Sequence, residues 1–122
     1  MASTHEQHRG ASLHASISDA VIRITAEYTG RGPTRARTVV NGEWIFVTLN
    51  DTLTKGERTL AANGRAQFVR DTRRAFQDAM REDLMGEVEA LSGRRVTAFL
   101  SDNHLDPDVA IEAFQLEPPA EG

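Results

Sequence analysis

Apolar residues recur at every third or fourth position in two long stretches of the chain, which is the spacing of an amphipathic helix. The recurring positions of the first stretch are Leu13, Ile17, Val21, Ile24 and Tyr28. Gly30 and Gly32-Pro33 end this predicted helix. The second helix is predicted over about 66–91 and ends at Ser92-Gly93. Its apolar stripe consists of Phe68/Val69, Thr72, Phe76, Ala79/Met80, Leu84, Val88 and Leu91.

Between and after these helices the pattern changes to alternation, which indicates strands. Residues 34–40 and 43–49 are separated by Asn41-Gly42, a pair typical of a tight hairpin turn because both residues tolerate positive φ. Residues 95–101 and 108–116 form a second predicted hairpin, and the segment between its strands is rich in turn-forming residues. Two β-hairpins are therefore predicted.

A short helix is predicted between the first hairpin and the second long helix. Thr54 and Glu57 have the spacing of a capping box, in which each side chain accepts from the other residue's backbone amide. The resulting order is α-β-β-α-α-β-β. Four antiparallel strands with three helices predict a two-layer α+β domain over residues 13–117, between tails at 1–12 and 118–122.

Apolar side chains alternate onto both faces of the predicted sheet. One face is predicted to hold Ile45, Val47, Leu49, Val96, Ala98 and Leu100, and the other Trp44, Phe46, Phe99, Phe114 and Leu116. An antiparallel sheet with one face in water alternates apolar with polar residues, and this one does so weakly. Either the chain's own helices cover both faces or a second copy covers one, and we favour a homodimer with two-fold symmetry.

The composition of the 122-residue chain fits a reducing, aqueous compartment. About 39% of it is hydrophobic, it has no cysteine, and no apolar run approaches the ~20 residues that cross a bilayer. The polar start of the chain has no hydrophobic core of a secretory signal. We expect a cytoplasmic protein without membrane insertion. The net charge of -4 disfavours a nucleic-acid partner.

The segment following the first helix has the composition of an anion site. Arg31, Gly32, Thr34, Arg35 and Arg37 combine forked cationic donors with a glycine that lets a ligand approach the backbone. Phosphate, carboxylate or bicarbonate would suit it. The alternative is a helix-to-strand turn whose arginines pair with acidic residues, and the spacing is not that of a P-loop.

A second polar cluster, formed by Asp102, Asn103, His104, Asp106 and Asp108, falls in the predicted turn of the second hairpin. Oxygen ligands at alternating positions suit a divalent cation, but the glycine and terminal glutamate of a calcium loop are missing. We interpret the cluster as a turn whose side chains cap backbone amides, and we predict no metal and no cofactor.

Two other functions remain open as alternatives. A small hydrolase or metal-dependent enzyme would use this turn, with Ser101 as nucleophile and His104 as base, but no glycine-rich nucleophile elbow accompanies them. We therefore assign no catalytic residue. An RNA-binding module would use Arg70, Arg73, Arg74 and Arg81, which are predicted on the outer face of the long helix. Interleaved acidic residues favour a solvated face.

Four stretches together resemble the MpsC-like family, and the resemblance covers about residues 13–117. They are Gly30 to Arg37, Leu53-Thr54 with Glu57 to Leu60, Val69 to Gln77, and Val96 to Asp108. The resemblance implies a link with a sodium-translocating, membrane-potential-generating system whose membrane partners are similar to bicarbonate transporters. It therefore implies an accessory or regulatory partner of a membrane transporter, and it brings no catalytic residues with it.

Overall fold

The computed structural model describes residues 2–118, with side chains described from residue 13 onward. Its elements are α1 (Ala2–Thr29), β1 (Arg35–Asn41), β2 (Trp44–Asn50), α2 (Lys55–Ala62), α3 (Ala66–Ser92), β3 (Val96–His104) and β4 (Val109–Leu116). This order confirms the predicted α+β fold. Helix α1 begins at Ala2, so it continues into the predicted N-terminal tail, while residues 1 and 119–122 lie outside the described residues.

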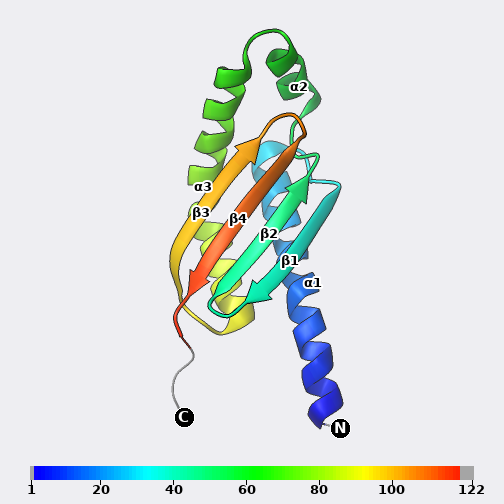
Figure 1. Ribbon diagram of the computed structural model, residues 1–122, viewed down its shortest axis with the longest axis vertical. Coiled ribbons are helices and arrows are strands. Elements are labelled where there is room, and N and C mark those ends of the chain that lie inside the picture. The colour runs from blue at the N-terminus through cyan, green and yellow to red at the C-terminus, as the bar shows by residue number, and fades with distance from the viewer. Residues whose placement is uncertain (1, 119–122) are drawn as a thin grey trace.

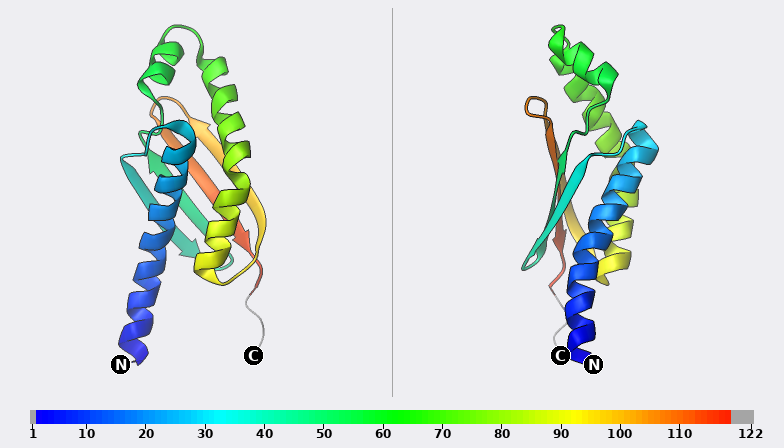
Figure 2. Two further views of the ribbon diagram at one scale, coloured as in Figure 1. Left: turned by 180° about the vertical axis from the view of Figure 1, so that it is seen from behind. Right: turned by 90° about the vertical axis from the view of Figure 1, so that its right-hand side faces the viewer.

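The four strands form one antiparallel sheet in the order β1-β2-β4-β3. The β1–β2 hairpin and the β3–β4 hairpin lie side by side in one layer, and they are joined by the pairing of β2 with β4 (Figure 1). Helices α1 and α3 form the second layer on a single face of this sheet (Figure 2). The hairpin of α2 and α3 extends beyond the end of the sheet, next to the turn between β3 and β4.

The hydrophobic core lies between the two layers. Ile17, Val21 and Ile24 of α1 are buried, which confirms the centre of the predicted stripe, whereas Tyr28 at its end is 37% exposed. The three buried residues meet Met80, Leu84 and Val88 of α3 and the inward side chains of the strands. At the surface, α1 and α3 are joined by a 2.6 Å hydrogen bond that the Tyr28 hydroxyl donates to the Asp83 carboxylate.

Local chemistry sets the ends of these elements as predicted. Gly42 has φ +61° in the β1–β2 turn, a conformation that L side chains rarely adopt. Both hydrogen bonds of the Thr54–Glu57 capping box are present, at 2.9 and 3.1 Å. Gly93 closes α3 with φ +70° in the left-handed region.

The predicted division of the strands between the two faces was wrong for β3 and β4. Phe99, Phe114 and Leu116 point toward the helices and belong to the core, whereas Ala98 and Leu100 lie on the other face. The pairing register shifts between Val96 and Ala98, so these two residues lie on opposite faces. Strand β3 also continues to His104, three residues beyond its predicted end. Pairing with β4, which local sequence patterns do not specify, determined both the register shift and the length of β3.

Candidate functional site

One face of the sheet carries no helix of the described chain, and we call it the open face (Figure 2). Strand pairing arranges its side chains in four rows that each cross all the strands. The rows are Arg35, Asn50, Val109 and His104; Arg37, Thr48, Ile111 and Asp102; Val39, Phe46, Ala113 and Leu100; and Asn41, Trp44, Gln115 and Ala98. The register alone therefore defines which groups a binding partner would meet.

The third row of the open face is apolar from one edge of the sheet to the other. Its two edge residues are solvent-exposed, Val39 at 44% and Leu100 at 60% of the side chain's full accessibility. Phe46 stacks on Trp44 of the neighbouring row, with ring centroids 5.7 Å apart and planes 7° apart. Ile111, in the second row, is also solvent-exposed, at 38%. Contiguous exposed apolar groups of this kind mark interaction surfaces on soluble proteins.

Charged groups of opposite sign lie at opposite edges of the open face. Arg35 and Arg37 project from edge strand β1, and Asp102 projects from edge strand β3. Arg37 and Asp102 share one row, separated by Thr48 and Ile111. The face is therefore an apolar strip with a positive edge and a negative edge.

The structure divides the predicted anion-binding residues between two places. Arg31 donates through Nε to the carbonyl of Asp51 at 3.1 Å, and the Thr34 hydroxyl donates to the Asp51 carboxylate at 2.5 Å. These bonds join the segment before β1 to the end of β2. Arg35 and Arg37 are two positions apart on the open face and have no ion pair with a described residue.

The residues of the second predicted polar cluster also separate. Asp102 and His104 lie on the open face, whereas Asn103 lies on the helix-facing side of β3. The His104 Nδ1 atom is 2.9 Å from the carbonyl of Pro107, across the turn. Among the described residues, no group of three or more His, Asp or Glu side chains is arranged to hold a metal ion.

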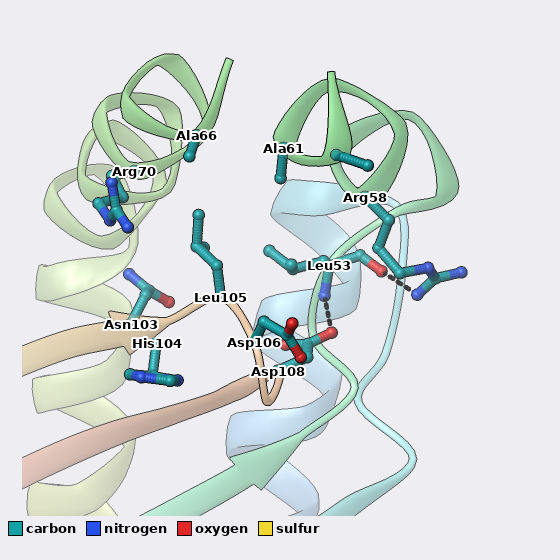
Figure 3. Close-up of a pocket in the computed structure, with 11 residues that line it drawn as sticks. Leu53, Arg58, Ala61, Ala66, Arg70, Asn103, His104, Leu105, Asp106 and Asp108 are labelled. Carbon is teal, nitrogen blue, oxygen red and sulfur yellow. Dashed lines mark hydrogen bonds between the residues drawn. The ribbon is translucent and has the colours of Figure 1, made fainter. Parts of the chain in front are cut away.

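Asp108 connects the β3–β4 turn to the segment that precedes α2. Its carboxylate accepts three hydrogen bonds, from the Thr52 backbone and hydroxyl at 3.1 and 3.0 Å and from the Leu53 backbone at 2.9 Å. Capping of backbone amides was the predicted role of this cluster, and Asp108 performs it. The carboxylate thus holds one wall of a cavity that lies between the turn and the α2–α3 hairpin (Figure 3).

A buried polar cluster under α3 was missed by the sequence analysis. Arg73 was predicted on the solvent face, and that prediction was wrong: its side chain is only 3% exposed. The guanidinium pairs with Glu57 of α2 at 3.3 Å, and Glu57 is itself 11% exposed. Gln77 and Glu112 are buried beside Arg73.

The sequence did contain one indication of this cluster. Val69, Arg73, Gln77 and Met80 follow one another at intervals of four, four and three, so they continue the buried seam of Leu84 and Val88. Polar residues in such a seam are easily assigned to the solvent. Phe68 shows the opposite error, since it was predicted in the stripe and is 60% exposed.

Glu112 is the buried carboxyl of this cluster, on the helix-facing side of β4. Burial raises its pKa to about 7, because the charged form loses its hydration. Ser101, Gln77 and Arg73 oppose this effect by lowering the pKa. One oxygen of Glu112 and the Ser101 hydroxyl nevertheless lack a hydrogen bond of good geometry with any described residue.

The positions of Ser101, His104 and the arginines of α3 test the two alternative functions, a small hydrolase and an RNA-binding module. Ser101 lies on the helix-facing side of β3 opposite Glu112, while His104 lies on the open face, so the two are not brought together as nucleophile and base. The arginines do not form one stripe either, since Arg73 is buried and Arg81 stacks over the Phe99 ring at 5.6 Å. Arg70 lines the cavity.

These features define a small two-layer α+β protein in which one sheet face is covered by no element of the described residues. The model of the family described as Na+-translocating membrane potential-generating system (MpsC) matches residues 10–118. The chain therefore belongs to the MpsC family, as the sequence resemblance predicted. No curated protein and no solved structure matches it. None of the helices in the described part of the chain is both long and apolar enough to span a bilayer.

Proposed function

We propose that this protein is a non-catalytic accessory component of a sodium-translocating membrane system, and that it works as a homodimer joined through the open face. Membership of the MpsC family supports the link with such a system. The observation that carries the proposal is the apolar row Val39, Phe46, Ala113 and Leu100, which crosses the whole sheet and is covered by no element that the structure describes. We place the protein in the cytoplasm, next to the membrane component.

The charges at the two edges select one way of stacking two copies. A two-fold axis that runs along the strands between β2 and β4 lays β1 of one copy over β3 of the other. Arg37 then faces the partner's Asp102, and the apolar rows face each other. An axis across the strands would instead lay β1 over β1 and bring like charges together, which costs free energy at an interface. Only the first arrangement satisfies both charged edges.

The size of the open face indicates the strength of this dimer. Four strands about 4.8 Å apart, with about seven residues of ~3.3 Å each, make a face of roughly 20 by 23 Å. Two such faces total roughly 900 Å² if they are treated as flat, which is in the range of weak and transient interfaces. We therefore expect a dissociation constant in the micromolar range.

Replacing Leu100 with glutamate is expected to abolish this dimer. The substitution places a carboxylate in the apolar row of both copies, where burial without a cation is unfavourable. Sedimentation velocity at about 10 to 100 µM should show a dimer for the wild type and a monomer of 13.4 kDa for the variant. Phe68→Glu is a matched control, because Phe68 on α3 has the same 60% exposure but lies outside the open face.

A charge exchange tests the geometry of the dimer separately. Arg37→Asp and Asp102→Arg should each weaken it about tenfold, by placing like charges opposite each other, and the double variant should restore it. A wild-type chain that stays monomeric at about 100 µM contradicts the dimer. A double variant as weak as the single ones contradicts the proposed axis.

The accessory role is tested by identifying the membrane partner. Affinity purification of the tagged chain after crosslinking in native cells should recover a membrane protein that transports sodium or bicarbonate, enriched over an untagged strain. Removing the chain should then lower the sodium-dependent membrane potential of vesicles, and adding it back should restore the potential. Recovery of ribosomal components alone, or a potential unchanged without the chain, would contradict the accessory role.

Anion binding by the segment from Arg31 to Arg37 is a second proposal. It rests on Arg35 and Arg37, which project from one side of β1 without a described acidic partner. Phosphate or bicarbonate bound there would neutralise the positive edge that the dimer uses. Anion binding and dimer formation would therefore compete, which would give the assembly a simple means of regulation.

A further inference from the structure

A cavity of about 500 Å³ lies between the α2–α3 hairpin and the β3–β4 turn, outside the open face (Figure 3). This volume is within the range of pockets that hold small molecules. It is bounded by segments that are far apart in the sequence: Leu53 before α2, the inner side of the helical hairpin, and the end of β3. The tertiary structure alone creates it.

Much of the cavity wall is apolar. Leu53 and Leu105 face it from opposite sides, and Ala61, Ala62 and Ala66 line the helical hairpin above them. Helix α2 has eight residues and buries none of them. A helix this short is marginal unless something packs against it. An occupant of the cavity would add apolar packing to α2, which the Glu57–Arg73 pair already joins to α3.

The polar groups of the cavity are of two kinds, those already engaged and those that are free. Asp108 is occupied by the Thr52 and Leu53 bonds, and Arg58 donates to the Leu53 carbonyl at 2.9 Å. Arg70 points from α3 toward Asn103 and makes no ion pair or hydrogen bond with a described residue (Figure 3).

Asn103 and Asp106 also carry polar atoms without a partner among the described residues. The Oδ1 atom of Asn103 is buried and has no hydrogen-bond partner among the described residues, a state that a native structure rarely leaves uncompensated. The carboxylate of Asp106 also lines the cavity and has no described partner. Among the described residues, the lining carries two arginines and two aspartates, so its formal charges balance, and its polar groups without a described partner include Arg70, Asn103 Oδ1 and Asp106.

We propose that the cavity binds a small zwitterion, an aliphatic α-amino acid. Its carboxylate would pair with Arg70, its ammonium group would donate to Asn103 Oδ1 beside Arg70, and its side chain would pack against Leu53 and Leu105. A dianionic phosphate ester would meet two aspartates as well as two arginines, so the lining offers it no net positive charge. A purely apolar molecule would leave Asn103 Oδ1 unpaired, and an unpaired buried acceptor is unfavourable.

Calorimetric titration of the full chain with four amino acids, alanine, valine, leucine and phenylalanine, tests the proposal. At least one aliphatic member should bind. For leucine, two further probes each remove one charge: 4-methylpentanoate lacks the ammonium group and 3-methylbutylamine lacks the carboxylate. Each should bind at least tenfold more weakly than leucine. Absence of binding by all four amino acids, or equal binding of leucine and both probes, overturns the proposal.

Paired variants locate the site. Arg70→Ala should weaken amino-acid binding at least tenfold, whereas Arg74→Ala should leave it unchanged, because Arg74 is an exposed residue of the same helix that does not line the cavity. Asn103→Ala removes the unpaired acceptor and should also weaken binding. Equal melting temperatures for the two arginine variants exclude a folding defect as the cause. Equal affinities for Arg70→Ala and Arg74→Ala would place the ligand elsewhere and overturn the assignment.

Discussion

Replacing Arg73 with alanine is expected to lower the free energy of unfolding by about 3 to 5 kcal/mol, the usual cost of removing one partner of a buried ion pair. The guanidinium is 3% exposed and lies 3.3 Å from the Glu57 carboxylate. Without it, Glu57 and Glu112 would be left as buried carboxyl groups without a cation. Urea denaturation at pH 7, followed by circular dichroism, measures the change.

Two further variants separate charge from packing at this position. Arg74→Ala changes the exposed neighbour on the same helix and should alter the free energy of unfolding by less than about 0.5 kcal/mol. The double variant Arg73→Met with Glu57→Gln replaces the pair by groups that need no counter-charge, and it should recover most of the loss. If Arg73→Ala costs less than about 1 kcal/mol, the cluster does not hold α2 and α3 to the sheet.

Replacing Glu112 with glutamine is expected to stabilise the protein at alkaline pH and to have little effect at acidic pH. Burial raises the folded-state pKa of Glu112 to about 7, well above the ordinary value of a glutamate near 4.5. The folded protein therefore binds this proton more tightly than the unfolded chain does. Wild-type stability should fall as the pH rises from about 4.5 to 7, because the fold must then bury the charge.

A glutamate whose pKa is raised to about 7 loses at most about 3 kcal/mol of stability when it ionises in the folded protein. Glu112→Gln should gain close to that amount in the free energy of unfolding at pH 8, and the gain should shrink below about 1 kcal/mol at pH 5. Glu43→Gln, at an exposed glutamate, should show no such dependence. A variant that is no more stable than the wild type at pH 8 would show that Glu112 is not strained by burial.

The two predictions concern one cluster and should not be additive. Arg73 lowers the pKa of Glu112, so the Arg73→Ala variant should lose even more stability as the pH rises. Combining Arg73→Ala with Glu112→Gln should recover part of the loss at pH 8. Such coupling would identify the cluster as a single electrostatic unit between α2, α3 and β4.

Short-range patterns predicted the elements of this fold well. The stripe of Ile17, Val21 and Ile24, the Asn41-Gly42 turn, the Thr54–Glu57 capping box and the Gly93 helix end all occur as expected. Each of these features depends on residues no more than a few positions apart. Backbone geometry and hydrogen bonding to near neighbours therefore suffice to produce them.

The candidate sites were predicted less well, and particular residues show why. The segments around Arg31 to Arg37 and Asp102 to Asp108 were predicted as candidate binding sites. In the structure, however, Arg31 donates a hydrogen bond to the Asp51 carbonyl, and Asn103 lies on the opposite sheet face from Asp102. Arg70 became part of a cavity wall because α3 passes the β3–β4 turn. Arg73 became buried because Glu57 of another helix offers it a counter-charge.

By itself, the sequence determined the order and type of the elements, because helical and strand periodicity and turn chemistry are local properties of the chain. The tertiary structure alone decided that β4 lies between β2 and β3, that Leu100 joins Phe46 on the open face, and that Arg73 faces Glu57. These outcomes depend on the register between strands and on the packing of helices distant in sequence. Both are set by burial and charge pairing over the whole domain, which no local pattern contains.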